Sequence, residues 1–201
     1  MKIVGLTYYD GTESIVLKSD SSMLVNRKPL FVPEWINELE ALPCWVLRVS
    51  RLGKCIAPRF ADRYYDAVAA GVDFFGADKL REANSAVKPW TEAIAFENSL
   101  AIGEWDVIAQ SQEPKVESGQ PKVESTWTVE RGGEVMERIM CSREGMSDLF
   151  AQAVARVSAL VTIRQGDLIY VAQRCKPWRL ESEDIICCTN AMNEVLYCKI
   201  K

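Results

Sequence analysis

The chain has 201 residues, of which 48% are apolar, and this length and composition predict one globular domain spanning residues 1–201. Its 28 acidic and 24 basic side chains give a net charge of -4, which argues against a protein that binds nucleic-acid phosphates or a membrane surface through basic residues. The chain contains no histidine, so serine or cysteine hydrolases with a histidine base, and zinc sites with histidine ligands, are excluded.

The first half of the chain predicts a strand, a helix and a second strand. Residues 42–52 alternate as a strand does, and Gly53 follows them. Pro58 suits the first turn of a helix, and apolar side chains recur at helical spacing after it, from Phe60 to Val68. Gly71 is placed to end this helix before a strand over residues 72–75.

The second half predicts one more helix and a hairpin. A helix is expected over residues 147–161, with Ser147 or Asp148 as its cap. Gly166 and Asp167 turn the chain into a strand over residues 168–172. Two further strands, over residues 185–189 and 194–200, form the expected C-terminal hairpin.

The seven cysteines predict reduced thiols. Their number is odd and no Cys-x-x-Cys occurs, so neither a disulfide framework nor a zinc ribbon is indicated, and a cytoplasmic location is expected. Tyr8, Tyr9 and Asp10 interrupt the stretch that a signal peptide would need. No segment is long and apolar enough to predict a membrane span.

The sequence Pro-Lys-Val-Glu-Ser occurs twice within residues 113–125. The repeat is too short for a solenoid and too polar for a core, so an exposed loop is expected there. A loop that binds another protein is the alternative.

A series of short motifs resembles the fumarylacetoacetate hydrolase family, in particular its compact bacterial members. They are Lys-Pro-Leu-Phe-Val-Pro at 28–33, Arg-Leu-Gly-Lys at 51–54, Arg-Tyr-Tyr-Asp-Ala-Val at 63–68, Gly-Val-Asp-Phe at 71–74, Ile-Gly-Glu-Trp at 102–105 and Gly-Asp-Leu-Ile-Tyr at 166–170. Their order and spacing carry the resemblance, which covers nearly the whole chain.

The resemblance implies an α+β, β-rich fold, a mixed β-roll or sandwich with few helices, and a homodimer. Members of the family cleave, isomerise or decarboxylate small 2-oxo or β-diketo acids with a magnesium or manganese ion. Such an ion needs several oxygen ligands to polarise a dicarbonyl substrate. The family supplies a Glu-x-Glu pair and a later aspartate.

In this sequence, the Glu-x-Glu positions fall on Leu42 and Cys44, and only the aspartate is retained, as Asp73. One carboxylate leaves too few ligands for magnesium to displace its water, so no bound metal ion is expected. Replacing buried carboxylates by leucine and cysteine also removes a desolvation cost, and closure of the former pocket is expected.

At the other catalytic positions of the family, this sequence also lacks the residues that the family's chemistry uses. Its lid histidine falls near Gly11 and the partner glutamate on Ser14. The family's lysine and arginine correspond to Ile94 and Ala77. The Thr-Gly-Thr-Pro loop that holds the substrate reads Val-Ala-Gln-Arg at 171–174. No residue is therefore assigned a catalytic role.

An active enzyme remains the alternative. In it, Glu38, Glu40 and Asp73 would hold the ion, because Glu38 and Glu40 form a genuine Glu-x-Glu, although a solvated turn before the strand fits them as well. Lys18 or Arg174 would receive the substrate carboxylate. Lys18 fits a surface lysine equally well. Asp73 could also be an ordinary partner of an arginine such as Arg81, but a residue of the former metal site is favoured for it because it matches the family position directly.

The sequence thus predicts a family member that is inactive or altered in its chemistry. A small carboxylic acid is a candidate ligand, and regulation of an active relative is a candidate role. Metal-dependent hydrolysis, isomerisation or decarboxylation of acylpyruvate-like or oxaloacetate-like acids is the alternative.

Overall fold

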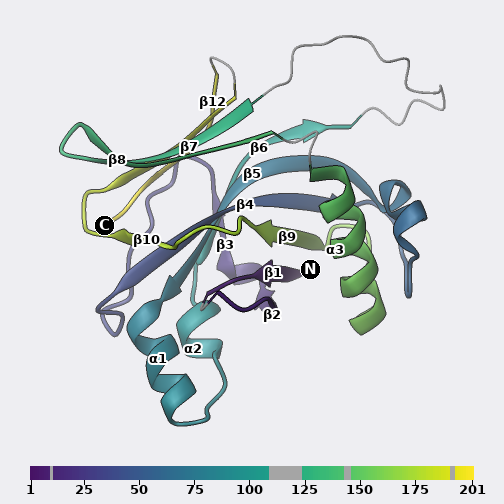
Figure 1. Cartoon of the computed structure of the whole chain (residues 1–201), viewed down its shortest axis with the longest axis horizontal. Coiled ribbons are helices and arrows are strands. Elements are labelled where there is room, and N and C mark those ends of the chain that lie inside the picture. The colour runs from purple at the N-terminus through teal and green to yellow at the C-terminus, as the bar shows by residue number, and fades with distance from the viewer. Residues whose placement is uncertain (10, 109–123, 143–145, 191–192) are drawn as a thin grey trace.

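The computed structural model describes residues 1–9, 11–108, 124–142, 146–190 and 193–201 (Figure 1). The larger of two sheets contains, in spatial order, β2 (Ser14–Ser19), β1 (Lys2–Thr7), β9 (Leu168–Ala172), β4 (Leu39–Val49), β5 (Tyr65–Gly76), β6 (Leu100–Val107) and β3 (Met23–Val25), with β10 (Trp178–Leu180) paired to β4. The smaller sheet contains β12 (Asn193–Lys199), β11 (Ile185–Asn190), β7 (Glu124–Arg131) and β8 (Glu134–Ser142). The expected β-rich α+β fold class is confirmed.

Helices lie on both faces of the larger sheet (Figure 1). They are α1 (Ala77–Ser85), α2 (Thr91–Ile94) and α3 (Ser147–Leu160), accompanied by 3-10 turns at Asp20–Ser22 and Pro58–Tyr64. The apolar side chains of α1 and α2 pack on one face of the larger sheet. Those of α3 pack on the other face, where the smaller sheet also lies.

The main core lies between the two sheets. Trp45 of β4 and Trp127 of β7 meet edge to face with ring centroids 5.0 Å apart. The indole N–H of Trp127 donates to the backbone oxygen of Gly71, 3.2 Å away in the larger sheet. This buried donor is therefore satisfied across the interface, and the bond fixes where the two sheets meet.

A second core lies between the larger sheet and the helices α1 and α2. Alternate residues of β4, namely Leu42, Cys44 and Val46, point into it. Phe75 of β5 and Tyr170 of β9 join them from the neighbouring strands. This second core contains the buried polar cluster described below.

Strand β4 begins earlier than the sequence predicted. It runs from Leu39, so Glu40 lies within the strand and not in a preceding turn. On one side of β4, the neighbouring strand changes from β9, which ends with the pair Cys44–Ala172, to β10, which begins with the pair Ala41–Trp178. Pro43 lies at this junction, so its missing N–H removes no bond between paired strands and the proline is tolerated.

The helix predicted after Pro58 is wrong beyond its first turns. A 3-10 segment ends at Tyr64, and the next residues form the long strand β5. Gly71 lies in the middle of β5 and does not end a helix. A Cβ atom there would lie 2.9 Å from Sγ of Cys44 and 3.0 Å from the backbone oxygen of Ala101, so close packing requires the glycine.

The other predicted elements are found, with changes at their ends. The helix α3 has Met146 at its N-cap and no side-chain cap bond, so neither Ser147 nor Asp148 caps it. The strand β9 has the predicted bounds, and β11 and β12 form the expected C-terminal pair. The helices α1 and α2 were not predicted.

Three other sequence predictions concern the loop, the cysteines and membrane spans. The repeated segment falls mostly on residues 109–123, outside the described part of the chain. All seven cysteines are unpaired thiols. Among the described residues, no helix is long and apolar enough to cross a membrane.

Replacing Gly103 by alanine tests the contact between β6 and β12. The new Cβ atom would lie 2.4 Å from the backbone oxygen of Val195, which cannot rotate away, so we expect the free energy of unfolding to fall by about 1–3 kcal/mol. Gly76→Ala is the matched control, because its Cβ atom would meet only the flexible Ile36 side chain at 3.2 Å. Urea denaturation would show equal losses in the two variants if backbone contact at Gly103 were unimportant.

Candidate functional site

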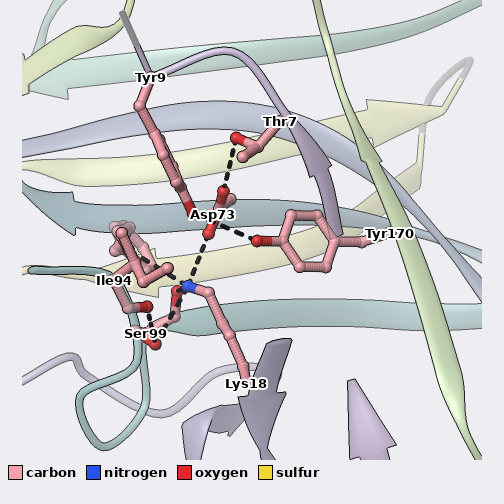
Figure 2. Close-up of polar contacts among 8 residues, drawn as sticks. Thr7, Tyr9, Lys18, Asp73, Ile94, Ser99 and Tyr170 are labelled. Atoms are coloured by element: carbon pink, nitrogen blue, oxygen red, sulfur yellow. Dashed lines mark hydrogen bonds and ion pairs between the residues drawn. The ribbon is translucent and has the colours of Figure 1, made fainter. Parts of the chain in front are cut away.

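A buried cluster of polar side chains lies on the α1 and α2 side of the larger sheet (Figure 2). Lys18 comes from β2, Asp73 from β5 and Tyr170 from β9. Thr7 ends β1, and Tyr9 follows two residues later. Strands distant in the sequence are brought together here because β1 pairs with both β2 and β9.

Lys18 and Asp73 form the centre of the cluster. Nζ of Lys18 lies 2.6 Å from Oδ1 of Asp73, and both side chains are fully buried. The ammonium also donates to the backbone oxygen and the hydroxyl of Ser99, at 2.9 and 3.1 Å, and to the oxygen of Phe74 at 3.3 Å. These acceptors are enough for all three ammonium protons, so the buried charge is paired and hydrogen-bonded.

Hydroxyl groups surround the other side of the Asp73 carboxylate. The hydroxyl of Thr7 donates to Oδ2 of Asp73 at 3.2 Å. The hydroxyls of Tyr9 and Tyr170 lie 3.2 Å from each other, and both rings point toward Asp73 (Figure 2). Gly5 makes room for Tyr170, because a Cβ atom on Gly5 would lie 2.0 Å from the ring. The Tyr9 ring in turn packs against Phe75 at a centroid distance of 4.5 Å.

Burial shifts the proton equilibria of this cluster. It raises the pKa of Tyr9, Tyr170 and Cys44 well above their usual values, and the nearby charge of Asp73 adds to each shift. Burial also lowers the pKa of Lys18, although the charge of Asp73 opposes this effect. Burial therefore favours the neutral form of these two tyrosines and of this cysteine.

The structure brings together two of the five residues that the sequence singled out. Lys18 and Asp73 form one buried pair, so Lys18 is not a surface lysine and Asp73 does not pair with Arg81. Glu38 instead binds Arg81, with 2.9 Å between Oε1 and Nη2. Glu40 lies on β4 opposite Phe75, half-buried, and burial raises its pKa while nearby cations, led by Arg81, lower it.

The fifth residue, Arg174, lies at the surface with 71% of its side chain exposed. Its guanidinium contacts Glu13 at 3.2 Å and lies 4.8 Å from the ring centre of Tyr8. These residues line an open cleft of about 650 Å³, together with Gly11, Thr12, Cys175 and Lys176. The cleft and the buried cluster are thus two separate arrangements.

Four residues of the cluster were not predicted from the sequence: Thr7, Tyr9, Ser99 and Tyr170. Thr7 and Tyr9 are two residues apart, which is a period-two signal, but the signal alone does not name their partners. Tyr170 was part of a family motif and carried no assigned role. Thr7 and Tyr9 come close to Tyr170 because β1 pairs with β9. This pairing connects residues about 165 positions apart in the sequence, so a local pattern does not predict it.

The residues at this site do not fit a divalent metal ion. The family resemblance places two carboxylates at positions 42 and 44, where this chain has leucine and cysteine. Leu42 lies opposite Asp73 in the pairing of β4 with β5, and Cys44 points to the same face of the sheet. Both are fully buried and supply no hard oxygen ligand. A further cation beside Asp73 would be repelled by the Lys18 ammonium. Among the described residues, no three acidic, cysteine or histidine side chains are grouped as a metal site.

The remaining positions carried over from the family resemblance also lack catalytic groups. The side chain of Ile94 is apolar and 5% exposed, and only its backbone oxygen takes part, accepting from the Ser99 hydroxyl at 3.1 Å. Ala77 begins α1 and is buried. The segment that would hold a substrate, residues 171–174, places buried Val171 and Ala172 in β9 and Arg174 at the surface cleft.

The family model for the fumarylacetoacetate (FAA) hydrolase C-terminal domain matches residues 7–171. The chain belongs to the fumarylacetoacetate hydrolase family. The match includes Lys18, Asp73 and Tyr170, so the whole buried cluster lies within the family domain. No curated protein matches the sequence.

Solved structures share this fold at low sequence identity. Fumarylpyruvate hydrolase from Pseudomonas aeruginosa, crystallised with Mn2+ and pyruvate, is 16% identical, with a TM-score of 0.76 over 99% of this chain and 88% of that one. The 5-carboxymethyl-2-hydroxymuconate delta-isomerase from Mycobacterium smegmatis is also 16% identical, with a TM-score of 0.72 over 99% of this chain and 78% of that one. At this identity the likeness shows the fold and not the activity.

Removing the Lys18 charge tests the buried pair. We expect Lys18→Met to lower the free energy of unfolding by about 3–5 kcal/mol, because Asp73 would be left buried and unpaired. The double variant Lys18→Met with Asp73→Leu should recover much of this loss, since it removes both charges. Lys88→Met, at an exposed lysine, is the control. A Lys18 variant as stable as this control in chemical denaturation would contradict the proposed pairing.

Proposed function

We propose that this chain is a non-catalytic member of the fumarylacetoacetate hydrolase family, which binds a small carboxylic acid without a divalent metal ion. The observation that carries the proposal is the Lys18–Asp73 pair. The one carboxylate retained at the metal position holds an internal cation at 2.6 Å, with no exposed surface on either side chain.

The chemistry of the surrounding groups supports this proposal. Metal-assisted cleavage or decarboxylation needs a Lewis acid at the substrate carbonyl and a group that moves a proton. Here burial keeps the Tyr9 and Tyr170 hydroxyls and the Cys44 thiol protonated, because their pKa values are raised well above the usual range. Leu42 fills the adjacent space with an apolar side chain.

The closed interior leaves the surface cleft as the candidate place for a ligand. Arg174 and Lys176 line it, and both are cations that bind carboxylates. Lys18 is assigned no substrate in this proposal, because its ammonium already has Asp73 and Ser99 as partners. In this proposal, the carboxylic acid binds at the surface cleft and is not cleaved there.

The alternative is an active metal-dependent enzyme. Its support is the retained Asp73 and the fold shared with a hydrolase crystallised with Mn2+ and pyruvate. A site built from Glu38, Glu40 and Asp73 would require Glu38 to leave Arg81 and Lys18 to leave Asp73. Because both ion pairs would have to be broken, we favour the metal-free protein.

Titration with MgCl2 and MnCl2 by calorimetry separates the two functions. We expect no saturable heat up to millimolar ion, an unchanged melting temperature with EDTA, and no turnover of acylpyruvates or oxaloacetate. The fumarylpyruvate hydrolase from Pseudomonas aeruginosa, measured in parallel, is the positive control. Binding of one ion per chain that is abolished by Asp73→Asn, together with metal-dependent turnover, would establish the enzyme instead.

A further inference from the structure

The Glu13 carboxylate is held by three donors in the surface cleft. The hydroxyl of Tyr8 donates to Oε2 at 2.7 Å, and Nη2 of Arg174 lies 3.2 Å from the same oxygen. Nη1 of Arg156 contacts the other oxygen, Oε1. A carboxylate thus already sits between two guanidinium groups and a phenol.

The donors come from three separate parts of the chain. Tyr8 follows β1, Arg156 lies on α3, and Arg174 follows β9. The guanidinium of Arg174 is also positioned by the face of the Tyr8 ring, at 4.8 Å. The packing of these three parts of the chain brings the donors together, so their arrangement does not depend on a single loop.

The cleft has spare positive charge and spare volume. Lys176 lines the same cleft of about 650 Å³, and Arg156 and Arg174 both contact Glu13, so three cations lie in or beside the cleft, where Glu13 is the one carboxylate among the described lining residues. This volume accommodates a small organic acid in addition to the protein's own side chain. One ligand carboxylate would take the place between the arginines, and a second would be attracted to Lys176.

Exchange of Glu13 for a ligand is energetically accessible. The Arg156 and Arg174 side chains are 47% and 71% exposed and that of Glu13 is 25% exposed, and ion pairs that remain open to solvent are weak. A guanidinium also offers a planar fork of donors that suits a second carboxylate. A free dicarboxylate can therefore compete with the tethered one.

We propose that this cleft, lined by Arg174 and Lys176 and bordered by Arg156 through its contact with Glu13, is a binding site for small dicarboxylates, and that Glu13 is a built-in competitor for the arginines. The inference rests on the proposed function, because it locates the carboxylate site and states what regulates its occupancy.

Succinate is a suitable probe, titrated by calorimetry into the full-length protein in EDTA. We expect weak saturable binding to the wild type, and binding about threefold to tenfold tighter in Glu13→Gln, because the internal competitor is gone. Arg174→Gln should weaken binding at least about tenfold. Two matched controls, Glu34→Gln and Arg164→Gln, make the same charge changes at other exposed positions and should leave the affinity unchanged.

Three outcomes, besides a failure of the Glu34→Gln control, would overturn the inference. They are the absence of saturable binding in both the wild type and Glu13→Gln, an affinity that Arg174→Gln does not change, and equal binding of inorganic sulfate, which would indicate an unselective cationic surface. Tightening in Glu34→Gln equal to that in Glu13→Gln would likewise show only a change in net charge.

The same titration distinguishes failure of this site from failure of the proposed function. Succinate binding that requires Mn2+, accompanied by turnover of acylpyruvates, would refute the metal-free function. Absence of binding in EDTA without any metal-dependent activity would refute the cleft alone.

Discussion

The buried pair of Lys18 and Asp73 is the constraint on which the arrangement of the larger sheet depends. Two charges without solvent contact are tolerated only if each has close partners of opposite charge or hydrogen-bonding groups. Lys18 satisfies this condition by reaching from the edge strand β2 to β5 and to Ser99 before β6. Strands that are not neighbours in the sheet are thereby fixed relative to one another.

The same pair balances the charge of Asp73 at a place where the family resemblance implies three carboxylates. Three carboxylates and a divalent ion have a formal sum of one negative charge, whereas one aspartate and one lysine sum to zero. The second arrangement needs no ion from solution, and it allows Leu42 and Cys44 to pack as apolar residues opposite β5. The Lys18 ammonium balances the Asp73 carboxylate, so the pair leaves no net charge in this part of the interior.

Sequence patterns predicted those parts of the fold that depend on local periodicity and on the family motifs. They gave the fold class, the helix α3 and the strand β9 because apolar spacing is retained there. They failed after Pro58, where helical spacing over Phe60 and Tyr64 continues into residues that pair as β5. Pairing with β4 and β6 on both sides outweighs the local pattern, as is usual for central strands.

The family resemblance predicted individual residues of the candidate site but not the contacts between them. Asp73 and Lys18 were both singled out, yet their contact was not, because it crosses from β2 to β5 through the pairing of sheet strands. The period-two spacing that includes Tyr9 and the family motif that includes Tyr170 do not show that the two hydroxyls meet. Tyr170 can lie beside β1 because Gly5 has no side chain to occupy the space of the ring.

The closed interior and the open cleft share one short stretch of chain. Tyr8 and Tyr9 are consecutive, but the Tyr8 hydroxyl binds Glu13 in the cleft whereas the Tyr9 hydroxyl meets Tyr170 beside Asp73. Tyr9 is held by Phe75 and the neighbouring hydroxyl, so it limits how far Tyr8 can move when a ligand displaces Glu13. The buried cluster thus acts as a rigid support for the cleft. The Lys18–Asp73 pair would then contribute to the proposed ligand binding by holding the cleft in shape.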